Sequence, residues 1–116
     1  MKKQLIFALL ALAMVATAVP ARAEFSLKDY KTAPRDSELD PVGIYIAGAG
    51  VSIKWVNMIY GEQTGIKMFC MPGKLQMNGQ DYENILNRYI ADYSPAENMP
   101  IEYLLILGLM DTFPCD

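Results

Sequence analysis

The sequence has no histidine and only two cysteines among its 116 residues. Without histidine, the chain cannot form a Ser-His-Asp or Cys-His catalytic site, a His-ligated metal site or an imidazole switch near neutral pH. The two cysteines alone are too few for a Cys/His zinc site, which needs three or four such ligands. An enzyme with this sequence would have to use carboxylates, lysine or tyrosine.

Carboxylates are the strongest of these catalytic candidates, but their spacing does not favour catalysis. Asp81 and Glu83 are two positions apart at the start of an expected helix, so their side chains do not face each other. A second acidic set lies where nothing is expected to bury it and raise a pKa, and it lacks the glycine and the glutamate of a calcium loop: Asp36, Glu38 and Asp40. We therefore expect a protein that is not an enzyme, with no catalytic residue, no metal ligand and no cofactor.

The N-terminus has the pattern of an export signal. Lys2 and Lys3 precede an apolar run at residues 5–19, and Ala21-Arg22-Ala23 is a small-x-small cleavage site. A membrane-spanning helix needs about 20 apolar residues, and this run is shorter. Its length therefore favours a cleaved signal peptide over a membrane anchor. We predict a signal peptide at residues 1–23, cleavage after Ala23, and a single mature domain at residues 24–116 in the periplasm.

Removal of residues 1–23 makes the protein more acidic. Three of the ten basic residues leave with the signal, so seven remain against thirteen acidic residues, a formal net charge of −6. A surface that binds phosphates needs a basic surplus, so nucleic acid and anionic lipid are poor partners. A protein partner fits this balance better.

Cys70 and Cys115 form an even pair in a short exported chain, for which a disulfide is the usual outcome. A redox-active pair is the alternative, but the sequence has no C-x-x-C motif and no basic residue beside either thiol to lower its pKa. Closing a loop of this length stabilises a fold by roughly 4 kcal/mol in the chain-entropy model. We expect a structural disulfide.

The first expected helix starts at Asp40 as N-cap with Pro41 at its first position, and ends at Gly61. Apolar residues recur in it at steps of three and four, which predicts one buried face. That face comprises Ile44, Ala47, Val51, Trp55 and Met58. Glycines in the same stretch predict close contact with another helix: Gly43, Gly48 and Gly50.

A second helix is expected at about residues 79–93, with an apolar stripe facing the core. The stripe comprises Tyr82, Ile85, Leu86, Tyr89, Ile90 and Tyr93. The residues expected to face solvent are Asp81, Glu83, Asn84, Asn87, Arg88 and Asp92.

A third helix is expected from an Asn98 cap, with Pro100 near its first position, to about residue 111. Its core face comprises Ile101, Leu104, Leu105, Gly108 and Leu109. Residues 24–39 lack such periodicity and are predicted to form an extended or short-helical N-terminal arm. The predicted fold is all-α: a compact bundle of three main helices plus short helical segments, pinned by one disulfide.

Sequence signatures surround both cysteines. Phe69-Cys70-Met71-Pro72 and the terminal Phe113-Pro114-Cys115 resemble the F-C-x-P and F-P-C signatures of the Rap/Tai family of type VI secretion amidase immunity proteins. Supporting features are Tyr45-Ile-Ala-Gly48, Gln80, and Tyr89-Ile90 followed by Pro95. The resemblance covers roughly residues 41–115. It departs from the family pattern at residues 107–112, which are often alanine-rich in the family.

The resemblance implies a periplasmic all-α immunity protein that binds a secreted peptidoglycan amidase effector and blocks its active site. Proteins of this kind are often dimeric, so a second copy of the chain is the other implied partner. Such an inhibitor needs a loop that enters the enzyme's cleft, and two exposed turns beside fixed anchors are candidates. The candidate partner-binding residues are Met71, Gly73, Lys74, Leu75, Gln76, Met77, Ser94, Glu97 and Asn98.

Two alternatives stay open at this point. Met71, Leu75 and Met77 could instead fold back over the core, because methionine serves interfaces and core gaps alike. A disulfide-pinned periplasmic acid-stress chaperone of the Hde type is the other function compatible with the sequence. Thirteen carboxylates that lose their charge in acid could drive such a protein to expose apolar surface.

Overall fold

The computed structural model of the chain describes residue 3, residues 24–36 and residues 38–116. The expected signal peptide and its cleavage site lie outside the described residues, apart from residue 3. The helices are α2 (Leu27–Thr32), α3 (Pro41–Thr64), α4 (Gly79–Tyr93) and α5 (Ile101–Thr112). Over the described ranges there is no β-strand, only an isolated bridge between Ser26 and Pro100. The all-α class, with three main helices and a short one, is confirmed.

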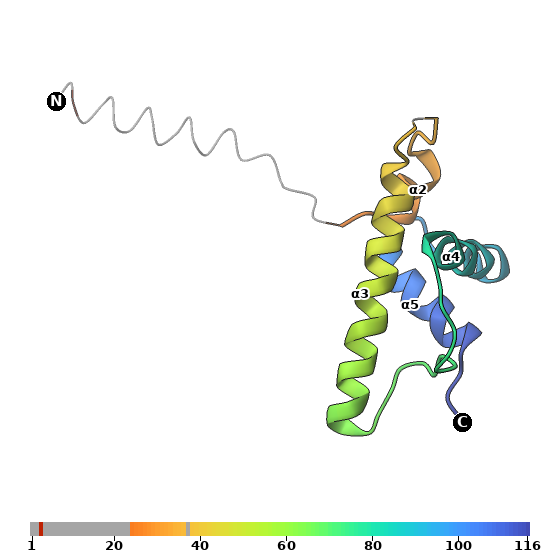
Figure 1. Ribbon diagram of the computed structural model, residues 1–116. Helices are drawn as coiled ribbons and strands as arrows, with labels where there is room; N and C mark the ends of the chain where they lie inside the picture. The colour runs from red at the N-terminus through yellow and green to blue at the C-terminus, as the bar shows by residue number, and fades with distance from the viewer. Residues whose placement is uncertain (1–2, 4–23, 37) are drawn as a thin grey trace.

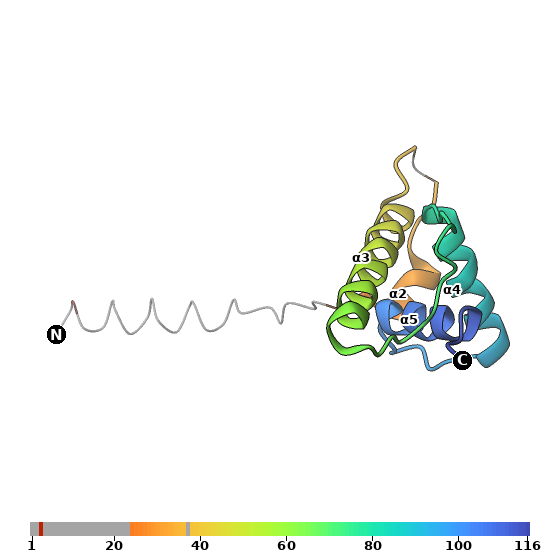
Figure 2. The same cartoon turned by 60° about the horizontal axis from the view of Figure 1, so that its bottom comes forward.

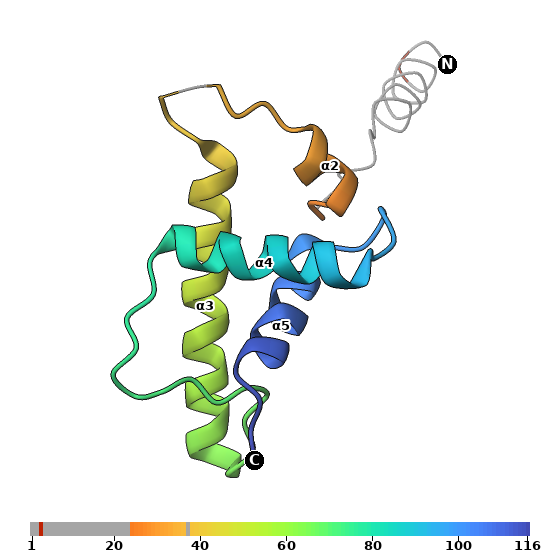
Figure 3. The same cartoon turned by 90° about the vertical axis from the view of Figure 1, so that its right-hand side faces the viewer.

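Helix α3 stands along one edge of the molecule, and α2, α4 and α5 all lie on the same side of it (Figures 1 and 2). Helix α4 crosses α3 and packs on both α3 and α5 (Figure 3). Residues 65–78 return from the C-terminal end of α3 to the start of α4 and run beside the C-terminus of the chain (Figure 3).

The core is built by every described helix and by Phe69 from the loop after α3. Its fully buried apolar side chains are Leu27, Ile46, Phe69, Leu86, Ile101, Leu104, Leu105 and Leu109. The predicted core face of α5 is confirmed at every position. In α4, Tyr82, Ile85 and Leu86 are buried, but Tyr93 is 56% exposed, contrary to the prediction. Tyr93 instead stacks on Tyr89 and donates a hydrogen bond to Asp111 at 2.9 Å on the surface.

The buried face of α3 was predicted wrongly. Ile44, Val51 and Trp55 point to solvent, with exposed fractions of 61%, 44% and 52%. The residues that face the core are Val42, Ile46, Gly50, Asn57 and Gly61. Helix α3 is apolar around most of its circumference, so periodicity could not select a side, and the packed side is the one that carries small residues.

Gly50 confirms the predicted close helix contact, because a Cβ built there would lie 2.4 Å from Cγ of the Tyr82 ring in α4. The prediction is wrong for Gly48, where a Cβ would meet nothing within 4 Å. A Cβ on Gly43 would first meet Asp40, but the Gly43 carbonyl oxygen lies 4.0 Å from an ideal Cβ on Gly79, so Gly43 is close to the start of α4.

The helix ends follow local chemistry. Asp40 is the N-cap of α3 with Pro41 after it, as predicted. The predicted end at Gly61 is wrong, because the helix continues to Thr64. Its C-cap is Gly65, which has a φ of 74°. Glycine adopts this left-handed conformation at little cost, and the Gly65 N–H donates to Gly61 O at 2.9 Å.

The predicted Asn98 cap of α5 is also wrong. Pro100 is the N-cap, and the Ile101 N–H donates to the Phe25 carbonyl at 2.9 Å. The N-terminal arm therefore performs the capping that a side chain was expected to perform. The arm is part of the core, since Leu27 is fully buried and its N–H donates to Met99 O at 2.9 Å.

Candidate protein-binding site

The two cysteine signatures meet at one place in the fold. Cys70 and Cys115 form a disulfide with their Cα atoms 5.0 Å apart, which confirms the expected pairing. The Cys70 N–H also donates to the Phe113 carbonyl at 2.8 Å, and Phe69 is fully buried beside them. These contacts join the loop after α3 to the end of α5.

Asn57 fastens the same loop to α3. Its side chain is buried, with Nδ2 donating to Phe69 O at 2.8 Å and Oδ1 accepting from Met68 N at 2.8 Å. The sequence prediction missed Asn57. Its signal is an amide with apolar neighbours on both sides in the helix, since a buried amide must find hydrogen-bond partners.

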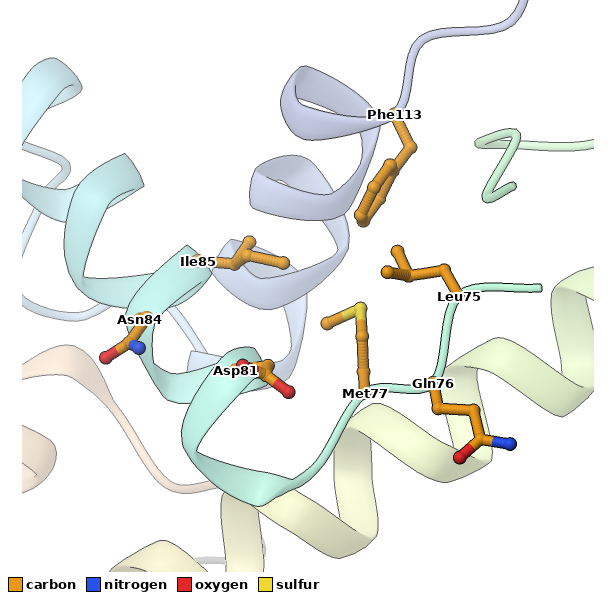
Figure 4. A pocket seen from close by; sticks show the side chains of 7 residues that line it. All are labelled: Leu75, Gln76, Met77, Asp81, Asn84, Ile85 and Phe113. Atoms are coloured by element: carbon orange, nitrogen blue, oxygen red, sulfur yellow. The ribbon is translucent and has the colours of Figure 1, made fainter. Parts of the chain in front are cut away.

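Segment 71–77 follows these anchors and leads into α4. Met71 and Met77 pack against the core, whereas Leu75 remains 38% exposed. Figure 4 shows Leu75, Met77, Ile85 and Phe113 pointing toward one another around a pocket of about 300 Å³, with Gln76 pointing away. The segment is thus held at both ends, and its middle stays at the surface.

A second pocket, of about 190 Å³, lies between α3 and the start of this segment. We call it the lysine pocket. Its lining residues are Lys54, Asn57, Met58, Lys67, Phe69, Met71, Pro72, Gly73 and Leu75. Leu75 lines both pockets, so segment 71–77 separates them.

The other predicted loop, residues 94–98, lies at the opposite end of α4. A helix of 15 residues is about 22 Å long, so the two loops do not form one surface. Ser94 ends α4 in a left-handed conformation. Glu97 pairs with Lys31 at 2.8 Å, and its carbonyl accepts the Lys28 N–H at 2.9 Å, so this loop, which also contains Asn98, is tied to the N-terminal arm.

The outward side of α3 carries many exposed apolar side chains. We call it the α3 outer face: Ile44, Tyr45, Val51, Trp55, Val56, Ile59 and Tyr60, which are 39% to 61% exposed. By length and composition α3 could cross a membrane, and only 22% of its most apolar stretch is buried. Soluble monomers rarely expose so many large apolar side chains in one patch.

A charged cluster holds the arm against α4. The Arg35 guanidinium bonds Glu83 and Asp40, the latter at 2.6 Å, and the Tyr30 hydroxyl donates to Glu83 at 2.9 Å. Glu83 was predicted to face solvent but is buried, because the arm covers this flank of α4.

Two groups of this cluster have shifted pKa values. Burial, reinforced by the hydrogen bond to Glu83, raises the pKa of Tyr30 to about 12. The Gly43 backbone N–H at the start of α3, with the Arg35 guanidinium next, lowers the pKa of Asp40 below its usual 3.8. Both shifts favour the protonation states that hold the cluster together at neutral pH.

Asp81, another candidate carboxylate, also has a structural contact. Asp81 forms a capping box with Asn78 at the start of α4, where its Oδ2 accepts the Asn78 N–H at 2.8 Å. Among the described residues no three histidine, cysteine or acidic side chains are grouped so that they could hold a metal ion.

No family model, curated protein or solved structure matches the chain. Function is therefore inferred from segment 71–77 with its two pockets, from the α3 outer face, and from the resemblance at the cysteines.

Proposed function

We propose that this chain is an exported immunity protein that binds a secreted peptidoglycan amidase and blocks its active site. The observation that carries the proposal is the rigidly held segment 71–77. The resemblance to amidase immunity proteins lies in the cysteine signatures, and these same residues form the anchor of the segment through the disulfide and the Cys70 to Phe113 hydrogen bond.

Rigidity serves inhibition because little conformational entropy is then lost on binding. Segment 71–77 is fixed at its start by the disulfide and Asn57 and at its end by the packing of Met77 against the core. The exposed residues between these anchors would enter the cleft of the enzyme: Pro72, Gly73, Lys74, Leu75 and Gln76. Residues 94–98 would lie outside this contact, because they are at the far end of α4.

The α3 outer face is proposed to bind a second copy of the chain. Seven side chains of ~150–200 Å² each, about half exposed, present roughly 500–700 Å². This exposed apolar area approaches the value of about 800 Å² that each partner contributes to a standard interface. Two copies of a straight apolar helix can cover each other in this way with an isologous contact.

Inhibition tests the first proposal. The mature chain is expected to form a complex with the peptidoglycan amidase against which it protects and to stop the hydrolysis of cell-wall fragments by this enzyme. Leu75→Arg is expected to raise the inhibitory concentration at least about tenfold, the loss of about 1.4 kcal/mol of binding. Met110→Arg on α5 is the matched control, since Met110 is 40% exposed and Leu75 38%. Equal inhibition by the two variants would exclude segment 71–77 as the contact.

Association tests the second proposal. The wild-type chain is expected to sediment as a dimer at micromolar concentration, and Trp55→Glu as a monomer, because a charge cannot be buried unpaired in an apolar interface. Tyr103→Glu is the control, since Tyr103 is 48% exposed on α5, away from α3. A wild-type chain that is monomeric at all concentrations would refute this assignment.

One observation favours the acid-stress chaperone as a second candidate. The arm is held to α4 by Arg35 between two carboxylates, Glu83 and Asp40, and strong acid protonates carboxylates. Release of the arm would uncover apolar surface that includes Leu27. Suppression of client aggregation at about pH 2–3, with no amidase inhibition at neutral pH, would favour this candidate.

A further inference from the structure

The lysine pocket has a composition that the proposed inhibitory contact does not by itself explain. Its lining combines apolar side chains, among them Phe69, Met71 and Met58, with two lysines. Only seven basic residues remain in a mature chain whose formal net charge is −6. Because two of these seven line one small pocket, the pocket is positively charged while the protein as a whole is negative.

Neither lysine is neutralised by the protein itself. The ion pairs of the described residues use Lys31 and Arg35, and none uses Lys54 or Lys67. No acidic side chain lines the pocket. An ammonium group without a carboxylate partner leaves its positive charge available to a ligand.

The pocket is formed before any ligand arrives. The Lys67 side chain lies across the backbone of α3 at Gly61, where an added Cβ would be 2.5 Å from Lys67 Cγ. On the opposite side, Asn57 fixes the backbone at Met68 and Phe69, and the disulfide fixes Cys70. A ligand would therefore meet a wall that is already ordered.

Size limits what can bind. Sites for small molecules and cofactors occupy about 300–1,000 Å³, and this pocket has about 190 Å³. It can hold one side chain of a partner together with part of a neighbouring one. Polyanions are disfavoured by the acidic charge of the rest of the molecule, and a phosphate site usually has an arginine fork, which this pocket lacks.

We infer that the lysine pocket receives a glutamate or aspartate side chain of the partner protein, with an apolar side chain next to it against Phe69 and Met71. Lys54 and Lys67 would bind the carboxylate. This inference rests on the proposed function and deepens it, because it states that the amidase presents an acidic residue beside an apolar one to segment 71–77.

Capped peptides test the inference without any amidase. The mature chain is titrated at pH 7 with Ac-Leu-Glu-Leu-NH2 and with Ac-Leu-Gln-Leu-NH2, and amide chemical shifts are followed by NMR. The glutamate peptide is expected to shift the amides of residues 67–73 and to bind about fivefold more tightly than the glutamine peptide. Equal affinity for the two peptides would overturn carboxylate recognition.

Variants locate the contact. The double variant Lys54→Glu/Lys67→Glu is expected to weaken the glutamate peptide about tenfold, and Lys67→Gln, which keeps Cβ and Cγ over Gly61, about threefold. Lys28→Glu, an exposed change on α2 that alters the net charge half as much as the double variant, is the control and should bind like wild type. A loss in Lys28→Glu as large as that in Lys67→Gln would show a general charge effect and overturn the inference.

Inorganic phosphate separates the two anion chemistries. Phosphate that shifts the same amides as strongly as the glutamate peptide would assign the pocket to phosphate and overturn the inference. Because the peptides need no enzyme, peptide binding that persists while amidase inhibition fails would refute the proposed function alone. Inhibition that persists without peptide binding would refute the pocket assignment alone.

Discussion

Two glycines on α3 give opposite predictions for the same substitution. Gly50 lies against the Tyr82 ring of α4, and Gly48, half a turn earlier, faces open space. In a helix interior, glycine is about 1 kcal/mol less favourable than alanine. Gly48→Ala is therefore expected to stabilise the domain by up to about 1 kcal/mol.

Gly50→Ala gains the same helix propensity but creates a clash. The new Cβ would lie 2.4 Å from Cγ, 2.5 Å from Cδ1 and 2.7 Å from Cδ2 of Tyr82. Carbon atoms in contact prefer about 3.5–4.0 Å, and the ring is only 1% exposed, so it cannot move away into solvent. Overpacking of this kind costs about 3 kcal/mol at the upper end of its usual range. The expected net result is a destabilisation of about 2 kcal/mol.

The difference between the two variants isolates the contact, because the propensity gain is common to both. Urea unfolding should place Gly50→Ala about 3 kcal/mol below Gly48→Ala, or roughly 10–20 °C lower in Tm. The protein is kept dilute so that association through the α3 outer face does not contribute. If Gly50→Ala proves as stable as Gly48→Ala, α4 does not cross α3 at Gly50 and the described packing is wrong.

The other predictions concern the charged cluster and the disulfide. Because the pKa of Tyr30 is raised to about 12, its neutral form stabilises the fold fully below about pH 10, and this contribution is lost as the pH rises from about 10 to 12. Urea unfolding across this range should show the loss in wild type and a smaller one in Tyr30→Phe. Because the pKa of Asp40 is lowered, its carboxylate stabilises the fold above its usual pKa of 3.8, and the contribution disappears as the pH falls through the lowered value. The stability difference between wild type and Asp40→Asn should thus be constant from about pH 5 to 7 and shrink as the pH falls below 3.8; a constant difference throughout would contradict the Asp40 assignment. Replacing both cysteines by serine should reduce the unfolding free energy by roughly 4 kcal/mol, given a sequence separation of 45, and a loss below about 1 kcal/mol would show that the bridge does not hold the loop.

The sequence predicted α4 and α5 well. The apolar residues of α4 form one stripe, in which Tyr82, Ile85 and Leu86 are buried, and the predicted core positions Leu104, Leu105 and Leu109 of α5 are buried as well. Helix α3 is apolar on several sides, so the pattern did not show which side faces α4, and the prediction chose the wrong one. The choice is made by Gly50 and Gly61, which allow Tyr82 and Lys67 to approach the helix backbone.

The candidate site was predicted in part. The cysteine pair and the position of segment 71–77 followed from the sequence alone. The two buried polar residues that organise the molecule did not. Asn57 is hydrogen-bonded to the backbone of a loop eleven and twelve positions away, and Glu83 is covered by the arm 48 positions away. Such contacts depend on how the chain returns on itself, which local periodicity does not encode.

Protection of living cells tests the central claim most directly. Cells that export the proposed amidase partner to the periplasm are expected to lyse, and co-expression of the full chain is expected to restore growth. A chain without residues 1–23 should fail to protect, because it stays in the cytoplasm, and Leu75→Arg should protect less than Met110→Arg. Continued lysis in the presence of exported, disulfide-bonded protein would contradict the proposal that this chain is an amidase immunity protein.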